Sequence, residues 1–120
     1  MRTELQGLEG QRRWFKATFR KYGTMHAHGI VGKTILLSSV KDLQGRILAD
    51  HIWINYTAGF DFAGNFELGD IVQFTAKVIP YVKGYAGEKI DDRLARPQSI
   101  DYRLVYPRNV QKMGKLEIIL

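Results

Sequence analysis

Hydrophobic and polar side chains alternate along five segments of this chain, and this alternation limits the fold more than any other feature. The five segments are residues 12–22, 34–41, 47–56, 71–81 and 99–106. A repeat of two residues places every second side chain on the same face of a strand, so that one face can enter a core. Only residues 57–66, where the alternation breaks, leave room for one or two helical turns. The pattern therefore predicts an all-β domain of five strands with a short helix or loop between the third and the fourth.

Most of the segments show which face enters the core. The side chains expected inside are Phe15, Ala17, Phe19, Leu48, Ile52, Ile54, Tyr56, Val72, Phe74, Ala76, Val78, Ile100, Tyr102 and Leu104. Asp50 interrupts the inward set of the third segment and leaves its register ambiguous. Pro80 has no backbone N–H, so it predicts the end of the fourth strand or a sheet edge.

The chain has 120 residues, which is the size of one domain. No apolar run approaches the length of about 20 residues that a membrane span needs, and the N-terminus lacks the apolar stretch of a secretory signal. Cysteine is absent, which excludes disulfides and thiolate sites. We expect a cytoplasmic protein with no membrane contact, consisting of a flexible arm at residues 1–11, a barrel at 12–108 and a tail or extra strand at 109–120. Its strand edges or apolar tail could pair with a second copy.

Basic residues are distributed unevenly along the chain. The formal net charge is +6, from 18 Lys and Arg against 12 Asp and Glu. Residues 1–46 carry a net +6, residues 47–76 a net −4 and residues 77–120 a net +4. The outer thirds therefore predict a positive face that would attract polyanions. The alternative is charge that serves solubility alone.

The order of strands and loops favours one barrel architecture. Long loops are expected at residues 23–33 and 82–98, and a hairpin turn at residues 42–46. Five strands, a break after the third, and long loops after the first and fourth are typical of the OB-fold, a partly open Greek-key barrel. An SH3-like barrel is the main competitor, but it does not need an elongated third strand followed by a break. We predict an OB-fold-like barrel that is closed or nearly closed.

Aromatic residues alternate with basic ones on the faces expected to point outward. Single-stranded nucleic acid is bound by rings that stack on bases and by cations that follow phosphates. In an OB-fold the binding face lies on the second and third strands, between the two long loops. The predicted nucleic-acid-binding residues are Trp14, Lys16, Arg20, Tyr22, Lys33, His51, Trp53, Asn55, Lys77, Tyr81, Lys83, Tyr85, Lys89, Arg93 and Arg96. Trp53 is the central candidate, because it faces away from Ile52 and Ile54.

Other chemical patterns are weaker. Residues 27–34 end like a phosphate-binding P-loop, but Ala27 stands where the motif needs glycine, and a strand follows instead of a helix. His26, His28 and His51 could ligate zinc, yet the first two lie in a glycine-rich segment with no carboxylate near them in sequence. No serine has an adjacent base or a nucleophile elbow. We therefore expect no catalytic residues, no metal and no cofactor, in a protein that is not an enzyme.

Several segments also resemble a known group of proteins. Residues 68–78, where Gly69 and Asp70 open an alternating strand, resemble the fourth strand of OB-fold proteins. Together with residues 15–19, 34–37, 50–53 and 81–85, they are similar to small OB-fold single-stranded nucleic-acid-binding proteins of phages and plasmids. This resemblance implies binding of single-stranded DNA or RNA, in the replication or transfer of a mobile genetic element.

A second class of function stays open. A small mobile-element barrel could bind a replication or host protein as an inhibitor or adaptor. Trp, Tyr and Arg are also enriched at protein interfaces, so the same aromatic face fits that role. Salt dependence separates the two, because binding through phosphates weakens steeply with ionic strength.

Overall fold

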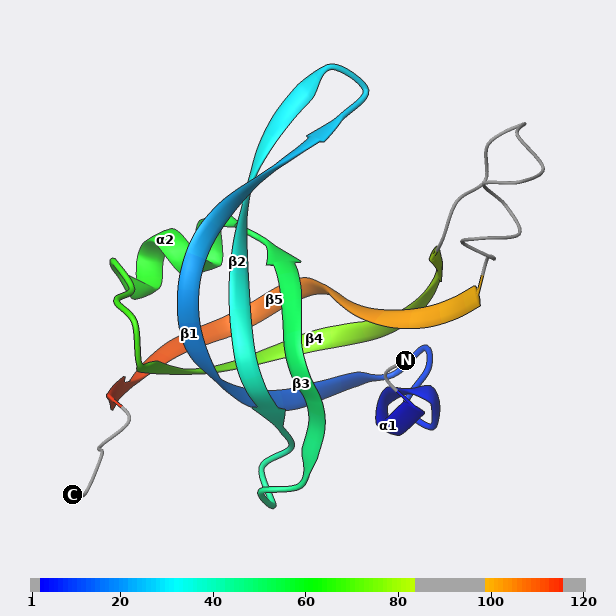
Figure 1. Ribbon diagram of the computed structural model, residues 1–120. Helices are drawn as coiled ribbons and strands as arrows, with labels where there is room; N and C mark the ends of the chain where they lie inside the picture. Colours follow the sequence, from blue (N-terminus) through cyan, green and yellow to red (C-terminus); the bar gives the residue numbers. More distant parts are fainter. Residues whose placement is uncertain (1–2, 84–98, 116–120) are drawn as a thin grey trace.

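Five antiparallel strands form one sheet in the computed structural model, which describes residues 3–83 and 99–115. The elements are α1 (Thr3–Gln6), β1 (Arg12–Ala27), β2 (Ile30–Lys41), β3 (Ile47–Asn55), α2 (Ala58–Ala63), β4 (Asp70–Lys83) and β5 (Ser99–Lys115). The order across the sheet is β3-β2-β1-β4-β5. The sheet is strongly curved, with α2 at one end and α1 at the other (Figure 1). The prediction of a mostly β domain with little helix is confirmed.

The sheet is not closed, which corrects the expectation of a closed or nearly closed barrel. β3 and β5 are its outer strands, and no ladder joins them within the described residues. The β4–β5 ladder contains three register shifts, and Tyr106 and Asn109 in β5 have positive φ angles of 52° and 54°. Such bulges bend and twist a strand. They direct β5 along β4, so that β5 contacts β3 without pairing with it.

The core lies on the inner face of the curved sheet and largely follows the predicted alternation. Its strand residues include Phe15, Ala17, Phe19, Ile35, Leu37, Leu48, Ile52, Ile54, Val72, Phe74, Ala76, Val78, Tyr102 and Leu104. Ile100, expected inside, is instead 49% exposed, because the β4–β5 hairpin extends there beyond the other strands. A bulge between Val40 and Lys41 places both Leu48 and Ala49 in the core. Asp50, which breaks the predicted inward set, is exposed between Ala49 and Ile52.

The segment expected to be a loop at residues 23–33 is a β-hairpin. Only His28 and Gly29 lie outside the two strands, and Ala27 pairs with Ile30 across them. Both turn residues have positive φ, 51° and 75°, as a two-residue type I′ turn requires. The hairpin extends β1 and β2 well beyond the body of the sheet (Figure 1). Gly23 and Gly32 therefore lie within strands, and only Gly29 belongs to the turn.

The segments near both ends of the described chain form regular elements. Residues 3–6, placed within a flexible arm from the sequence, form α1, and Leu5 is fully buried in the core. β5 continues to Lys115, so residues 109–115 extend the fifth strand. Pro80 lies inside β4, where only β5 pairs with that strand, since the β1–β4 ladder ends at Lys77. The missing N–H of Pro80 therefore disrupts no ladder with β1.

Candidate nucleic-acid interface

A groove lies where the β1–β2 hairpin, the end of β3 and β5 meet. Its volume is about 350 Å³. The residues that line it are Thr24, Met25, Thr34, Trp53, Asn55 and Arg103. None of these is acidic, and one of them is the tryptophan that the sequence singles out. We call this site the Trp53 groove.

Trp53 points outward because its neighbours point inward. Ile52 and Ile54 are 0% and 3% exposed, and successive side chains of a strand face opposite ways. The indole reaches across the sheet to Gly23 of β1, where an added Cβ would lie only 2.6 Å from ring atom Cζ3. Glycine at position 23 therefore leaves space for the ring. The indole packs against β1 while 43% of the side chain stays exposed, which suits a platform for a stacked base.

Two basic groups lie near the indole. The Nζ of Lys21 is 5.9 Å from the centroid of the Trp53 ring, within reach of a cation–π interaction. Arg103 of β5 lines the same groove. Its guanidinium carbon is 5.9 Å from the centroid of the Tyr81 ring.

β5 also contains a buried carboxylate, two residues before Arg103. Asp101 is 2% exposed, lies opposite Tyr81 in the ladder and accepts a hydrogen bond of 2.8 Å from the N–H of Tyr102. The Nζ of Lys83 lies 3.7 Å from a carboxylate oxygen of Asp101. The charge of Lys83 is thus partly neutralised, whereas Arg103 is exposed and forms no ion pair with an acidic residue in the part of the chain that the structure describes.

The groove combines three kinds of recognition chemistry. Trp53 offers a flat apolar ring, and Arg103 offers a guanidinium that can form paired hydrogen bonds with a phosphate. Asn55 and Thr34 add an amide and a hydroxyl, which can donate to and accept from the edge of a base. The arrangement suits an unpaired nucleotide with an exposed ring and a negative charge.

Tyr22 and Lys33 lie outside the groove, and the position of Tyr22 corrects its expected place on the face of Trp14. A register shift between Phe19 and Lys21 reverses the alternation of β1, so that Tyr22 packs against the core. The Nζ of Lys33 lies 4.3 Å from the Tyr22 ring centroid and 4.1 Å from that of Tyr56. Tyr22 accepts a hydrogen bond from the N–H of Phe66 through its hydroxyl oxygen.

Tyr56 completes this second aromatic group. Its hydroxyl donates a hydrogen bond to Asp61 of α2. This bond, together with desolvation and the negative charge of Asp61, raises the pKa of Tyr56 to about 12. We call Tyr22, Lys33, Tyr56 and Asp61 the tyrosine cluster. Its polar groups are engaged with one another or with the backbone.

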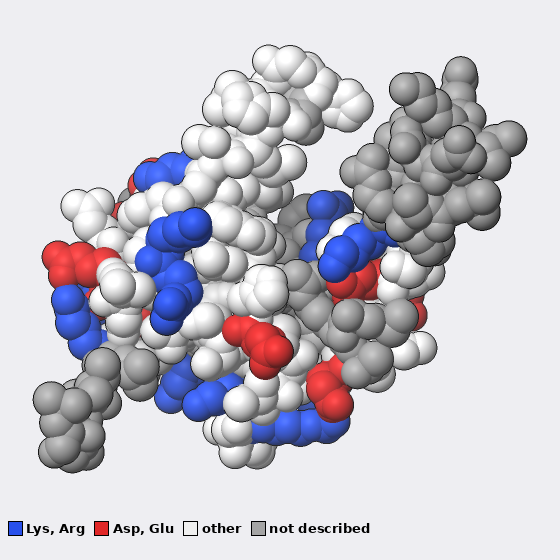
Figure 2. Space-filling model, viewed as in Figure 1, with Lys and Arg blue, Asp and Glu red and all other residues white. Residues whose placement is uncertain are grey.

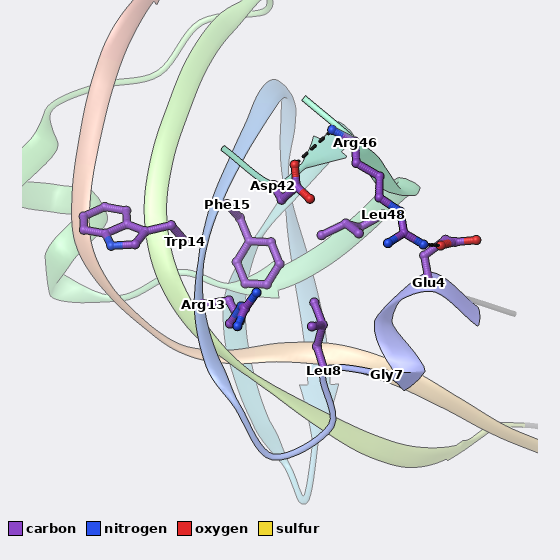
Figure 3. Close-up of a pocket in the computed structure, with 9 residues that line it drawn as sticks. All are labelled: Glu4, Gly7, Leu8, Arg13, Trp14, Phe15, Asp42, Arg46 and Leu48. Atoms are coloured by element: carbon purple, nitrogen blue, oxygen red, sulfur yellow. Dashed lines mark hydrogen bonds and ion pairs between the residues drawn. The ribbon is translucent and has the colours of Figure 1, made fainter. Parts of the chain in front are cut away.

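The remaining predicted residues of β1 and β4 lie on the outer face of the sheet. Trp14, Lys16, Arg20 and Lys77 belong to this set, and Trp14 lies opposite Thr75. Trp14 borders a pocket of about 370 Å³ that includes Glu4, Leu8, Arg13 and Arg46. Figure 3 shows its indole at the margin of that pocket, pointing away from the other lining side chains.

The predicted site is thus divided among several places. Trp53 and Asn55 line the groove, while Tyr81 lies next to Arg103 and Lys83 next to Asp101, outside the residues that line it. His51 is exposed on β3, two residues before Trp53, and lies opposite Ser38. Tyr85, Lys89, Arg93 and Arg96 lie outside the described residues.

Sequence reasoning missed four of the groove residues, namely Thr24, Met25, Thr34 and Arg103. The exposure of Arg103 could have been predicted from the sequence, because Arg103 lies between Tyr102 and Leu104, which both point inward. The same alternation that exposes Trp53 therefore also exposes Arg103. The other three lie in or beside the hairpin that was expected to be a loop.

Basic side chains gather along β1. In Figure 2, blue side chains lie over the curve that β1 follows in Figure 1, and a further basic group lies beside acidic side chains next to the grey residues. The part of the predicted positive face that belongs to residues 84–98 lies outside the described residues.

Comparison of the chain with protein families, with curated proteins and with solved structures finds no match. Within residues 3–83 and 99–115, no three metal-ligating side chains lie together as a metal site would need. No helix in that part of the chain is long and apolar enough to cross a membrane.

Proposed function

We propose that this protein is a non-enzymatic single-stranded nucleic-acid-binding protein that holds an unpaired nucleotide in the Trp53 groove. The observation that carries the proposal is that exposed Trp53 and exposed Arg103, which come from different parts of the sheet, line one groove. Stacking on one aromatic ring contributes about 1–3 kcal/mol per base, whichever base it is. The guanidinium adds a contact to phosphate.

The strand order supports the proposal of an OB-fold-like barrel. β1, β2 and β3 follow one another, and β4 returns to lie beside β1 on the side away from β2, which is the order of a Greek key. α2 lies between β3 and β4 in the chain. Oligonucleotides bind OB-folds on the face of the second and third strands, beside the connection of the first and second. The proposal is supported by the lining of the Trp53 groove, which includes residues of β3 and of the β1–β2 hairpin.

The resemblance to small phage and plasmid proteins supports a role in the replication or transfer of mobile DNA. Single-stranded DNA is the substrate we favour, and RNA of the same sequence is the comparison to make. The groove residues offer no group dedicated to the ribose 2′-hydroxyl.

A protein partner is the second candidate, and the hairpin favours it. Met25, Ile30 and Val31 are 40%, 71% and 62% exposed on this projecting element. Exposed apolar side chains around a tryptophan are also typical of protein interfaces.

Titration with fluorescent oligonucleotides, single- and double-stranded, tests the proposal. We expect single strands to bind more tightly and affinity to fall with salt, at a log–log slope of about −0.7 per phosphate contacted. Trp53→Ala should weaken binding by about 1–3 kcal/mol. Lys115→Gln serves as the control, because the Nζ of Lys115 already contacts Glu67 at 2.6 Å.

Two results would overturn the proposal. One is unchanged affinity in folded Trp53→Ala, and the other is a flat salt response. A flat response with binding to a protein would favour the partner interpretation.

A further inference from the structure

β1 and the two strands paired with it, β2 and β4, expose basic residues but no acidic residue. β1 and β2 contain no Asp or Glu, and β1 alone contains Arg12, Arg13, Lys16, Arg20 and Lys21. The acidic residues of β4 and β5 are Asp70 and Asp101, which are 1% and 2% exposed. Each lies within 4.0 Å of a lysine, so neither offsets the basic groups on the outer face.

Like charges face one another across two ladders of this surface. Lys16 lies opposite Lys41 in the β1–β2 ladder, and Arg12 lies opposite Lys77 in the β1–β4 ladder. Directly opposed like charges destabilise a sheet. Such a surface gains stability when a polyanion binds to it, because the anion relieves this repulsion.

An exposed ring lies among these charges. Trp14 is 38% exposed and follows Arg12 by two residues on β1. Arg12 is held in place, since its Nη1 donates to Thr75 Oγ1 at 3.1 Å and its Nη2 donates to the carbonyl of Tyr106 at 2.8 Å. Arg108 is exposed on β5, where it lies opposite Thr75 of β4.

This surface continues from the Trp53 groove. Lys21 approaches the Trp53 ring, and from there β1 leads through Arg20 and Lys16 to Trp14. Seven residues of extended strand separate Lys21 from Trp14, a span of roughly 23 Å. OB-fold proteins contact about 4–16 nucleotides of single strand, so one strand can cover both places.

We propose that a single nucleic-acid strand held in the Trp53 groove continues along the outer face of β1 and stacks a second base on Trp14. This rests on the proposed function of the groove. We call the second surface the β1 track, formed by Arg12, Trp14, Lys16, Arg20, Lys41, Lys77 and Arg108. A single strand fits it better than a duplex, because a duplex keeps its bases stacked inside and leaves Trp14 without a partner.

The two tryptophans of the chain make the proposal directly testable. Trp14→Phe leaves Trp53 as the only indole, and Trp53→Phe leaves Trp14, while each phenylalanine keeps a ring that can stack. Both proteins are titrated with oligothymidylates of about 5 and about 20 nucleotides, and indole fluorescence is followed. We expect the short strand to quench Trp53 only and the long strand to quench both.

The outcomes separate the two proposals. If neither strand quenches Trp53, the proposed function of the groove is wrong. If both strands quench Trp53 but the long one leaves Trp14 unchanged, the groove stands and the β1 track is wrong. Quenching of Trp14 by the short strand while Trp53 is unaffected would also overturn the track as an extension of the groove.

Charge neutralisation gives an independent readout. Lys77→Gln should weaken binding of the long strand several-fold, reduce its salt slope by about 0.7 and leave the short strand unaffected. Lys115→Gln removes the same charge from a lysine already paired with Glu67 and should change neither. Equal effects of Lys77→Gln and Lys115→Gln would show that binding depends only on the total charge of the protein, and would overturn the β1 track.

Discussion

The Trp53 groove and the tyrosine cluster both place a basic group beside aromatic rings, but they differ in what the rings leave available. In the tyrosine cluster, Lys33 lies near two rings at once, and the hydroxyls of Tyr22 and Tyr56 have partners within the protein. In the Trp53 groove, Trp53 is 43% exposed, and Arg103 lines the same open groove. The same residue types therefore stabilise the fold in one place and remain available to a ligand in the other.

The largest expected effect is on the stability of the tyrosine cluster. Tyr22→Ala removes a ring that contacts Phe19 and Tyr56 and leaves the Phe66 N–H without its acceptor. We expect a loss of about 3 kcal/mol in the free energy of unfolding, against about 1 kcal/mol or less for Trp53→Ala. Urea denaturation of both variants measures this difference. Equal losses would show that Trp53 is a core residue and would end the contrast between the two sites.

A substitution beside the groove can displace Trp53 without removing it. In Gly23→Ala the new Cβ would meet the indole at 2.6 Å, so the ring must move outward. We expect a loss of about 1 kcal/mol in oligonucleotide binding with a red-shifted indole emission. Gly32→Ala is the matched control on the same hairpin, because its Cβ meets the flexible Met25 side chain at 3.3 Å. Similar binding losses in both variants would contradict a specific role for the space above Gly23.

The two basic residues should respond in opposite ways. Lys33→Gln removes a cation from two rings and should lower stability by about 0.5–1 kcal/mol, with no change in binding. Arg103→Gln should leave stability unchanged and reduce the salt slope by about 0.7. Thermal melting and salt titration of both variants give the comparison. Loss of binding in Lys33→Gln would bring the tyrosine cluster into the interface.

The smallest effect is visible only in alkaline solution. The folded pKa of Tyr56 is about 12, above its ordinary value of 10.0, because its hydroxyl donates to Asp61. The folded state therefore keeps this proton more firmly than the unfolded state. The stabilisation is complete below a pH of about 10 and is lost as the pH rises through about 12. Wild-type stability should fall more steeply in this window than that of Tyr56→Phe. Identical pH profiles in denaturation would contradict the effect of Asp61 on this pKa.

The alternation of residues predicted the strands and the outward position of Trp53, because period two is a direct consequence of strand geometry. It could not predict Tyr22, since the register shift after Phe19 depends on the pairing with β2. Arg103 could be predicted, because its neighbours Tyr102 and Leu104 are apolar and lie in a regular part of β5. That Arg103 and Trp53 line the same groove could not be predicted, because their proximity depends on how far the sheet curves between β3 and β5.

The glycines of the hairpin gave a misleading signal for a related reason. Gly23 and Gly32 are typical of a loop when only the local sequence is considered. In the structure, Gly23 lies beneath the indole of Trp53, and Gly32 contacts Met25 across the hairpin. Glycine at position 23 is required by the indole of a residue distant in sequence, which no local pattern reveals.

The position of β1 between β2 and β4 also sets the order in which the groove can be assembled during folding. β1, β2 and β3 are joined by short turns, so this half forms through contacts between residues close in sequence. The pairing of Arg12 with Lys77 must first close a long loop, which slows folding. Trp53 belongs to the early half, whereas Arg103 arrives only when β4 and β5 dock. A partly denatured chain that releases β4 and β5 therefore keeps Trp53 in its strand but loses Arg103 from the groove. Oligonucleotide binding should then disappear before most of the β-structure does.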